Sequence, residues 1–537
     1  MVNGSKCWIV IFLCVNIFAN SSESTSTVVF NITCDPHDDS SQNCQSESLE
    51  TIAAMAKDLV DIQINIKIPQ LKLIADVNFT NLNSLTIIGE SNMAYISCTM
   101  GNEISSVGLA MRNITDTVTL KSVSLISCGS QTKDLSSNNY SSALLIFHCK
   151  NVQFNRVVIA NSKGTGLKVL EPQGGEVTIT SSIFKENKLP QEYKAESIMG
   201  GGGVFIVLHQ PAAPLSFLFD NCTFENNTAH TIEFNFGYTN DLGKSVTGYG
   251  SGGGVHLSIK NRLRNVDIIF SGCSFIGNQA FVGGGITVRI YSLKHADEMH
   301  NVTLQIRDSL FEQNGCDSTQ NAYFGGGAYL SFATDFEEAV TTDIHYLVRN
   351  VSFIENCAEL GGGVLYYSDR SEYGFSDSIN NSMLFDNCTF KSNKAHIGSA
   401  VDLAPSMFLK LVTGYTIDPT FSNCQFLENI VMGNKSQFQK TASIGTIYGS
   451  LYNIHFNGSN YFENNKGTPV YIVNGVANFT NSNASFINNT GLEGGAMALI
   501  GSSLMTVGPN SYEFVNNTAA NKGGAIYVLL TDSTDFI

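Results

Sequence analysis

A two-part repeat constrains this chain more than any other feature of its sequence. The first part is Phe-x-x-Asn, a phenylalanine followed three residues later by an asparagine. It recurs at Phe184/Asn187, Phe224/Asn227, Phe275/Asn278, Phe311/Asn314, Phe353/Asn356, Phe390/Asn393, Phe426/Asn429, Phe462/Asn465, Phe486/Asn489 and Phe514/Asn517. The second part is Gly-Gly followed by a small or branched apolar residue. It recurs at Gly202-Gly203, Gly253-Gly254, Gly284-Gly285, Gly326-Gly327, Gly362-Gly363, Gly494-Gly495 and Gly523-Gly524.

The alternation of the two parts indicates a solenoid of stacked coils. Successive motif phenylalanines are unevenly spaced, which is typical of stacked units whose loops differ in length. Several units also place Cys two residues before Phe, as in Cys222 and Phe224, and residues two apart on a strand point to the same face. Each unit is therefore predicted to contain a strand, a tight turn, a second strand, another turn, the Gly-Gly element and a third strand. Three strands per unit, each paired with the same strand of the next unit, describe an all-β fold, the right-handed parallel β-helix.

Each motif residue has a physical role in such a coil. The phenylalanine rings are expected to stack inside, where each ring buries a large apolar area. The asparagine tolerates the left-handed conformation of a sharp turn, and its amide can form a ladder from coil to coil. Gly-Gly supplies positive φ angles and lets neighbouring backbones approach closely. Leu125 to Cys128 and Val158 to Asn161 are predicted to be early, degenerate copies of the Phe-x-x-Asn element.

The paired motifs resemble the repeats of chlamydial-type polymorphic outer membrane proteins. The resemblance rests on Phe-x-x-Asn and Gly-Gly-Ala/Ile/Val and covers roughly residue 158 to the C-terminus. It implies a parallel β-helix and a surface-exposed adhesin. Similar repeats occur in secreted proteins of eukaryotes, and the sequons described below favour a eukaryotic secreted relative.

The N-terminal residues 1–22 are predicted to be a secretory signal peptide. Lys6 precedes an apolar run, Trp8 to Val15, and small residues follow it. The run is shorter than the roughly 20 residues that span a bilayer, so no transmembrane span is expected in the mature chain.

Residues 23–59 are predicted to be a polar segment with one disulfide, followed by a short amphipathic helix. The apolar residues from Ser48 to Leu59 recur at helical spacing, and this helix would cap the open N-terminal end of the solenoid. The β-helix is predicted to fill residues 60–537. Because no polar end unit follows Leu530, the sequence is expected to be a fragment with more protein downstream.

The charge limits which partners are expected, and the cysteine content limits the expected cellular compartment. The net charge is −16 and charged residues make up 14%, with no basic run, so nucleic acid is not an expected partner. The 13 cysteines fit an oxidising compartment. Two disulfides are predicted, Cys34–Cys44 and Cys316–Cys357. The inward pairs Cys222/Cys273 and Cys388/Cys424 fit either disulfides or reduced stacking.

Asn-x-Ser/Thr sequons are dense, and some of them coincide with the repeat. In a secreted chain, those in loops and turns would carry surface glycans. The glycosylation candidates are Asn31, Asn78, Asn113, Asn139, Asn226, Asn301, Asn380, Asn434 and Asn457.

Function is predicted from the loops, because the repeat itself serves the fold. The longest insertion carries Phe234, Phe236, Tyr238 and Tyr249 and is a candidate ligand loop; these aromatics could equally pack the loop onto the β-helix. No catalytic residue, cofactor site or metal site is predicted. The expected function is therefore non-enzymatic, in adhesion, matrix or carbohydrate recognition, with carbohydrate or an extracellular or cell-surface protein as partner. A polysaccharide-active enzyme of the pectin lyase type and a rigid spacer are the alternatives.

Overall fold

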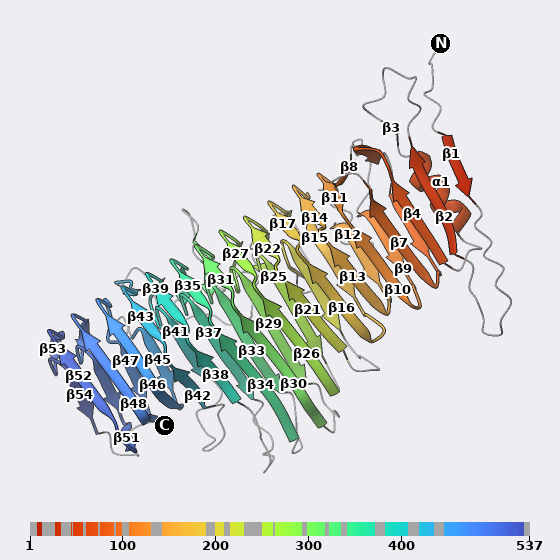
Figure 1. Ribbon diagram of the computed structural model, residues 1–537. Coiled ribbons are helices and arrows are strands. Elements are labelled where there is room, and N and C mark those ends of the chain that lie inside the picture. The colour runs from red at the N-terminus through yellow and green to blue at the C-terminus, as the bar shows by residue number, and fades with distance from the viewer. Residues whose placement is uncertain are drawn as a thin grey trace, which may run out of the picture.

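The structure is a computed structural model, and it forms a long stack of parallel-stranded coils (Figure 1). It describes residues 8–12, 27–33, 44–45, 47–56, 61–73, 76–90, 93–98, 107–129, 142–189, 199–208, 215–229, 250–260, 264–292, 298–316, 322–334, 341–370, 382–405, 418–433 and 445–530. Every coil supplies strands that pair with the equivalent strands of the coils before and after it. The predicted parallel β-helix is confirmed.

Three long ladders run the length of the stack, and all of their pairings are parallel. The first ladder contains β2 (Thr27–Thr33), β4 (Asp61–Ile66), β7 (Ser84–Gly89), β10 (Thr117–Lys121), β13 (Asn151–Asn155), β16 (Gly175–Thr180), β21 (Leu215–Asp220), β26 (Arg264–Ser271), β30 (Glu298–Arg307), β34 (Thr341–Arg349), β38 (Ser382–Asp386), β42 (Pro419–Ser422), β46 (Asn453–Glu463), β48 (Val476–Ile487) and β51 (Ser503–Val507).

The second ladder follows the first after a tight turn, and β46 and β48 are long enough to belong to both. Its other strands are β3 (Cys44–Gln45), β5 (Gln70–Leu73), β8 (Ala94–Cys98), β11 (Val123–Ile126), β14 (Val158–Ala160), β17 (Ile183–Lys185), β22 (Thr223–Glu225), β27 (Ser274–Ile276), β31 (Leu310–Glu312), β35 (Ser352–Ile354), β39 (Thr389–Lys391), β43 (Gln425–Leu427) and β52 (Ser511–Val515).

The third ladder is a separate 14-stranded sheet that begins after the Gly-Gly element in the regular coils. It contains β6 (Val77–Thr80), β9 (Val107–Arg112), β12 (Ser142–Phe147), β15 (Thr165–Leu170), β20 (Val204–Leu208), β25 (Val255–Lys260), β29 (Ile286–Ser292), β33 (Ala328–Thr334), β37 (Val364–Arg370), β41 (Val401–Pro405), β45 (Ile447–Ser450), β47 (Val470–Val473), β50 (Met497–Ile500) and β54 (Ile526–Leu529).

Short strands form a fourth set of pairings between the asparagine turn and the Gly-Gly element. They are β18 (Lys188–Leu189), β19 (Met199–Gly200), β23 (Thr228–Ala229), β24 (Gly250–Ser251), β28 (Gln279–Ala280), β32 (Ala322–Phe324), β36 (Ala358–Leu360), β40 (Lys394–Ala395), β44 (Ile430–Val431), β49 (Thr490–Glu493) and β53 (Thr518–Lys522).

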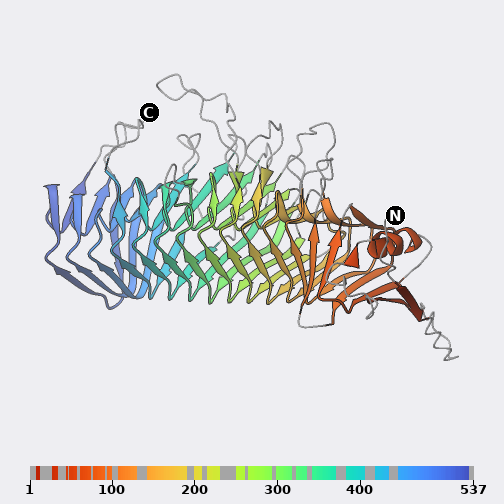
Figure 2. The same ribbon diagram turned by 90° about the horizontal axis from the view of Figure 1, so that it is seen from above.

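The N-terminal end differs from the prediction in three respects. The helix α1 spans Glu47–Met55, shorter than the predicted 48–59, and lies at that end of the stack (Figure 2). Leu49 and Ile52 are fully buried on its inner face, as expected for a cap. The β-helix starts before residue 60, because β2 pairs in parallel with β4 and buries Phe30. A further strand, β1 (Trp8–Phe12), lies in the predicted signal segment and pairs antiparallel with β2.

The motif phenylalanines form one continuous stack inside the coils. From Phe184 to Phe514, each ring is nearly parallel to the next, and neighbouring centroids lie 4.5–5.2 Å apart. This spacing follows from the strand separation of about 4.8 Å. A second stack begins with Phe219 and Phe270, whose centroids lie 4.7 Å apart.

The motif asparagines form a buried ladder beside the phenylalanine stack. The Asn227 Nδ2 donates to the Asn278 Oδ1 at 3.0 Å and to the Phe184 carbonyl at 2.8 Å. The Asn278 Oδ1 also accepts the backbone N–H of Asn227. The same arrangement repeats through Asn314, Asn356 and the later motif asparagines. Two donors and two acceptor contacts are thus used at each interior rung, so the polar groups are satisfied inside an apolar core.

The left-handed residue of this turn is not the motif asparagine, as predicted, but the residue before it. Asn226, Gly277 and Glu355 have φ angles of 51°, 61° and 54°, whereas the buried Asn227 and Asn356 have no positive φ. The side chain of the motif asparagine must point inward to join the ladder, so the bend falls one residue earlier, where the side chain faces outward.

The prediction for the Gly-Gly element holds in only some of the coils. In the coils that carry three consecutive glycines, the positive φ lies on the glycine that precedes the pair, 66° at Gly252 and 62° at Gly283. In the last two pairs, it lies on the first glycine of the pair itself, 66° at both Gly494 and Gly523. The pair itself is required by crowding, because a Cβ on Gly254 would lie 2.6 Å from the carbonyl oxygen of Gly285. Gly284, Gly285, Gly362 and Gly363 are packed equally closely.

Candidate functional site

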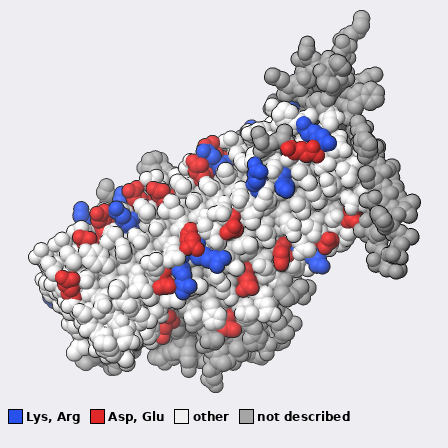
Figure 3. Space-filling view, viewed as in Figure 1, with Lys and Arg blue, Asp and Glu red and all other residues white. Residues whose placement is uncertain are grey.

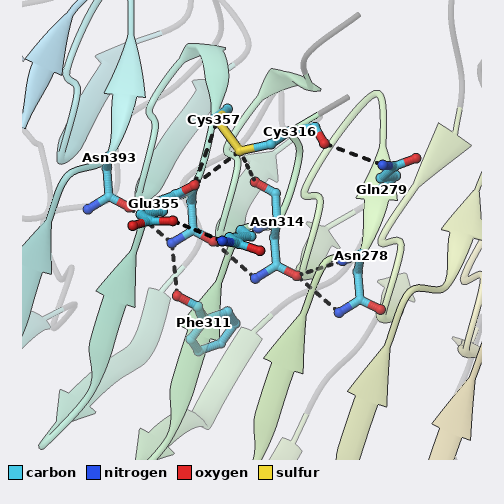
Figure 4. The surroundings of a disulfide bond; sticks show 10 residues. Asn278, Gln279, Phe311, Asn314, Cys316, Glu355, Cys357 and Asn393 are labelled. Atoms are coloured by element: carbon cyan, nitrogen blue, oxygen red, sulfur yellow. Dashed lines mark hydrogen bonds between the residues drawn. A yellow bond between two sulfur atoms is a disulfide. The ribbon is translucent and has the colours of Figure 1, made fainter. Parts of the chain in front are cut away.

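The predicted disulfide between Cys316 and Cys357 joins two neighbouring coils. The two Cα atoms lie 4.9 Å apart. The Gln279 Nε2 donates to the Cys316 carbonyl at 3.3 Å, so a third coil is tied to the same place (Figure 4). The buried rungs Asn314 and Asn356 lie directly beside the disulfide. The disulfide therefore fixes the point at which the chain leaves the asparagine turn.

A cluster of aromatic side chains lies a few residues beyond this disulfide. We define the aromatic patch as Phe281, Tyr323, Phe324, Tyr329 and Leu360, which pack together over the buried Leu365. The short strands bring them together: Val282 bridges to Phe324, and β32 pairs with β36 so that Phe324 lies opposite Leu360. Tyr329 comes from β33, on the outward side of the third ladder.

The rings of the patch are held in fixed orientations. Phe281 and Tyr323 stack with centroids 5.2 Å apart, and Tyr323 meets Phe324 edge to face at 4.6 Å. The Arg289 guanidinium lies 5.5 Å from the centre of the Tyr329 ring. Phe281 and Tyr329 are buried, whereas Tyr323, Phe324 and Leu360 are half-buried and form the outer side of the patch.

Polar groups border the outer side of the patch. The Glu359 Oε2 lies 3.1 Å from the His396 Nε2, and the His396 Nδ1 lies 3.0 Å from the Met432 carbonyl oxygen. Burial, and secondarily the charge of Glu359, raises the pKa of Tyr323 to about 12, so its phenol keeps its proton at neutral pH. The patch thus combines apolar ring faces with a hydroxyl donor and a carboxylate acceptor.

Two titratable groups are buried elsewhere on the outward side of the third ladder. Burial lowers the pKa of Lys168 on β15 to about 7 and raises the pKa of Asp402 on β41 to about 8. The Lys168 Nζ lies 5.9 Å from the centre of the Phe205 ring. The Asp402 Oδ1 accepts no hydrogen bond. These groups lie on distant coils, so they do not form a pair with each other.

The other predicted residues fall into three groups. The candidate ligand-loop residues Phe234, Phe236, Tyr238 and Tyr249 lie outside the described residues, as do Asn139, Asn380, Asn434 and Cys34; the side chain of Cys44 is not described either. The sequon residues Asn78, Asn113, Asn226 and Asn301 are exposed, and Asn31 and Asn457 are half-buried. The acidic motif residues, such as Glu225 and Glu355, face outward or lie in turns.

Sequence reasoning missed the aromatic patch and a second disulfide. Cys98 and Cys128 are bonded with their Cα atoms 4.8 Å apart. The patch had a local signal: large apolar residues stand directly before the glycine triplets, as Phe324 and Leu360 do before Gly325 and Gly361. Apolar side chains at the same place in successive coils must meet in a solenoid.

Comparison with known proteins gives one match, to the Chlamydia polymorphic membrane protein repeat, which covers residues 511–529. This segment contains the motif residues Phe514 and Asn517. The protein is a β-helix with repeats of this type. No curated protein and no solved structure matches the chain.

The described ranges also limit two kinds of site. They contain no helix long and apolar enough to cross a membrane. Within them, no group of three or more His, Cys, Asp or Glu side chains could hold a metal ion. Acidic and basic side chains are interspersed on the face seen in Figure 3, with large uncharged areas between them.

Proposed function

We propose that this protein is a non-enzymatic recognition protein, secreted or displayed at the cell surface, that binds carbohydrate through the aromatic patch. The aromatic patch is the observation that carries the proposal. The match to a membrane-protein repeat, the disulfides between coils and the signal-like N-terminus support the location.

The chemistry of the patch suits a sugar ring. The C–H face of a pyranose is apolar and stacks on an aromatic ring, whereas its hydroxyl groups need donors and acceptors at the edge. Tyr323 and Phe324 supply ring faces, and the Tyr323 hydroxyl and the Glu359 carboxylate lie beside them. The Cys316–Cys357 disulfide holds the two coils together, so less conformational freedom would be lost on binding.

A glycan array probed with the full chain tests this proposal. We expect binding to a restricted set of glycans, and we expect Tyr323→Ala to weaken it at least tenfold, which is about 1.4 kcal/mol. The matched control is Tyr95→Ala, because Tyr95 is 47% exposed on a distant coil and should leave binding unchanged. Binding that survives Tyr323→Ala at full strength would contradict a role for the patch.

The same preparation distinguishes the alternatives. Incubation with uronic-acid polymers should give no cleavage products. Turnover that copurifies with the protein and is lost in Glu359→Gln would replace the proposal with the polysaccharide-active enzyme. The absence of both binding and turnover would favour the rigid spacer.

A further inference from the structure

Four buried thiols occupy one inward position of the coils and form two neighbouring pairs. Cys222 precedes β22 and Cys273 precedes β27, and the Ser274 N–H donates to the Cys222 carbonyl at 2.9 Å. Cys388 and Cys424 are related in the same way through the Gln425 N–H. All four are at most 1% exposed, and all are thiols in the structure.

The pairs are within reach of a covalent bond. Equivalent residues on neighbouring coils lie about 4.8 Å apart, inside the Cα separation of roughly 4.4–6.8 Å that disulfides span. The two disulfides of this protein bridge neighbouring coils at 4.8 and 4.9 Å. The Cys273 thiol lies 3.4 Å from the Phe219 carbonyl, and the Cys424 thiol lies 3.4 Å from the Phe385 carbonyl. In each pair, therefore, the later thiol contacts the coil that carries its partner.

The order of the cysteines along the stack gives these pairs a pattern. Cys222 and Cys273 lie on the coils of β21 and β26, Cys316 and Cys357 on those of β30 and β34, and Cys388 and Cys424 on those of β38 and β42. These six strands are consecutive in the first ladder (Figure 1). The three cysteine pairs thus divide six successive coils two by two, without overlap, and the middle pair is already a disulfide.

We propose that Cys222/Cys273 and Cys388/Cys424 are dithiol sites that close to disulfides in an oxidising compartment and clamp their coils as Cys316–Cys357 does. The oxidant is a small-molecule or protein disulfide. One cysteine thiolate attacks it, forms a mixed disulfide and releases a thiol, and the second cysteine then displaces the other half. The two cysteines lose two electrons and two protons, and the oxidant is reduced to two thiols.

Burial sets when this reaction can occur. Burial and the neighbouring Cys388 thiol raise the pKa of the Cys424 thiol well above its usual range, and the Cys273 thiol together with burial does the same for Cys222. Few thiolates form in the closed coil, so closure should occur during folding or when a coil opens.

Peptide mapping of the full chain tests the proposal. The protein is folded in a buffer of reduced and oxidised glutathione, unfolded with iodoacetamide present, and digested without reduction. We expect two linked peptide pairs, Cys222–Cys273 and Cys388–Cys424, each about 2 Da lighter than the sum of its two free-thiol peptides. Cys149, a single buried thiol, should be alkylated and serves as the internal control.

A single substitution tests whether the two cysteine pairs close independently of each other. Cys273→Ser should leave Cys222 alkylated while Cys388–Cys424 still closes. Alkylation of Cys222, Cys273, Cys388 and Cys424 in a sample whose Cys316–Cys357 peptides remain linked would overturn the proposal.

Discussion

The asparagines inside the solenoid and those on its outer turns form ladders with the same coil-to-coil spacing in different surroundings. The inner Asn356 is fully buried, and its side chain makes hydrogen bonds to Phe311 and Asn393 and accepts two from Asn314. On the outer turn, Asn350 is exposed, donates to Asp308 at 2.9 Å and accepts from Asn387 at 2.8 Å. Water can replace the outer bonds but not the inner ones, so we expect burial, rather than the ladder pattern, to determine the contribution to stability.

The largest effect is expected inside, at the phenylalanine stack. Phe353→Ala removes a ring packed between Phe311 and Phe390 and should lower the free energy of unfolding by about 3–5 kcal/mol. Urea unfolding followed by circular dichroism measures the loss. Tyr95→Ala, on an exposed face, should change it by less than about 0.5 kcal/mol. Equal effects of the two substitutions would contradict the view that the buried phenylalanine stack contributes most of the stability.

The next effect compares the two asparagine ladders directly. Asn356→Ala leaves the Phe311 carbonyl and the Asn314 amide groups without partners, and each such buried group costs about 1–3 kcal/mol. The exposed control is Asn350→Gly, because glycine accepts the φ of 54° at this position, and we expect a change within about 0.5 kcal/mol. The same urea titration distinguishes them, and a larger loss for Asn350→Gly would refute the role of burial.

A pH titration extends the comparison to a buried carboxyl group. Burial raises the pKa of Asp402 from 3.8 to about 8, so the folded protein holds this proton more tightly than the unfolded chain. The resulting stability is fully present below pH 4 and is lost as the pH rises from about 4 to 8, with a slope of about 1.4 kcal/mol per pH unit at most. Thermal unfolding from pH 4 to 8 should show a steeper decline for the wild type than for Asp402→Asn. Identical slopes would contradict burial of an unpaired carboxyl.

The smallest effect lies on the outer side of the turn. Glu428 has a φ of 55°, where Gly277 stands in another coil, so Glu428→Gly should raise the free energy of unfolding by about 0.5–1 kcal/mol. Glu312, on the strand β31, is the control: Glu312→Gly should lower it by a similar amount. A destabilised Glu428→Gly protein would show that left-handed strain is unimportant at this turn.

The repeat made the architecture predictable because its period records which side chains meet between coils. Phe224 stacks on Phe275, and Asn227 bonds to Asn278, because equivalent residues of successive coils must be neighbours. The exact bend was not predictable from residue preference alone, since Glu355 occupies a left-handed position that favours Gly or Asn. At this turn, the position of the bend is determined by the next residue, Asn356, whose side chain must point inward to join the ladder.

The early coils show where the pattern fails. Ile159 lies opposite Phe184, so the ladder position falls on Ser162 rather than on the predicted Asn161. The Ser162 N–H donates to the Asn187 Oδ1 at 3.1 Å and begins the ladder. Aliphatic residues fill the interior as well as phenylalanine does, so the motif fades while the fold continues.

The aromatic patch was missed for another reason: its residues belong to separate coils joined by loops of unequal length.

Native-state hydrogen exchange, read by mass spectrometry on the full chain, measures whether the buried asparagine ladder holds the coils together. Peptides that contain the inner rungs Asn314, Asn356 and Asn393 should exchange together and slowly, because their amide groups open only when coils separate. Rapid exchange at the inner rungs in the folded protein would contradict a solenoid held together by a buried asparagine ladder.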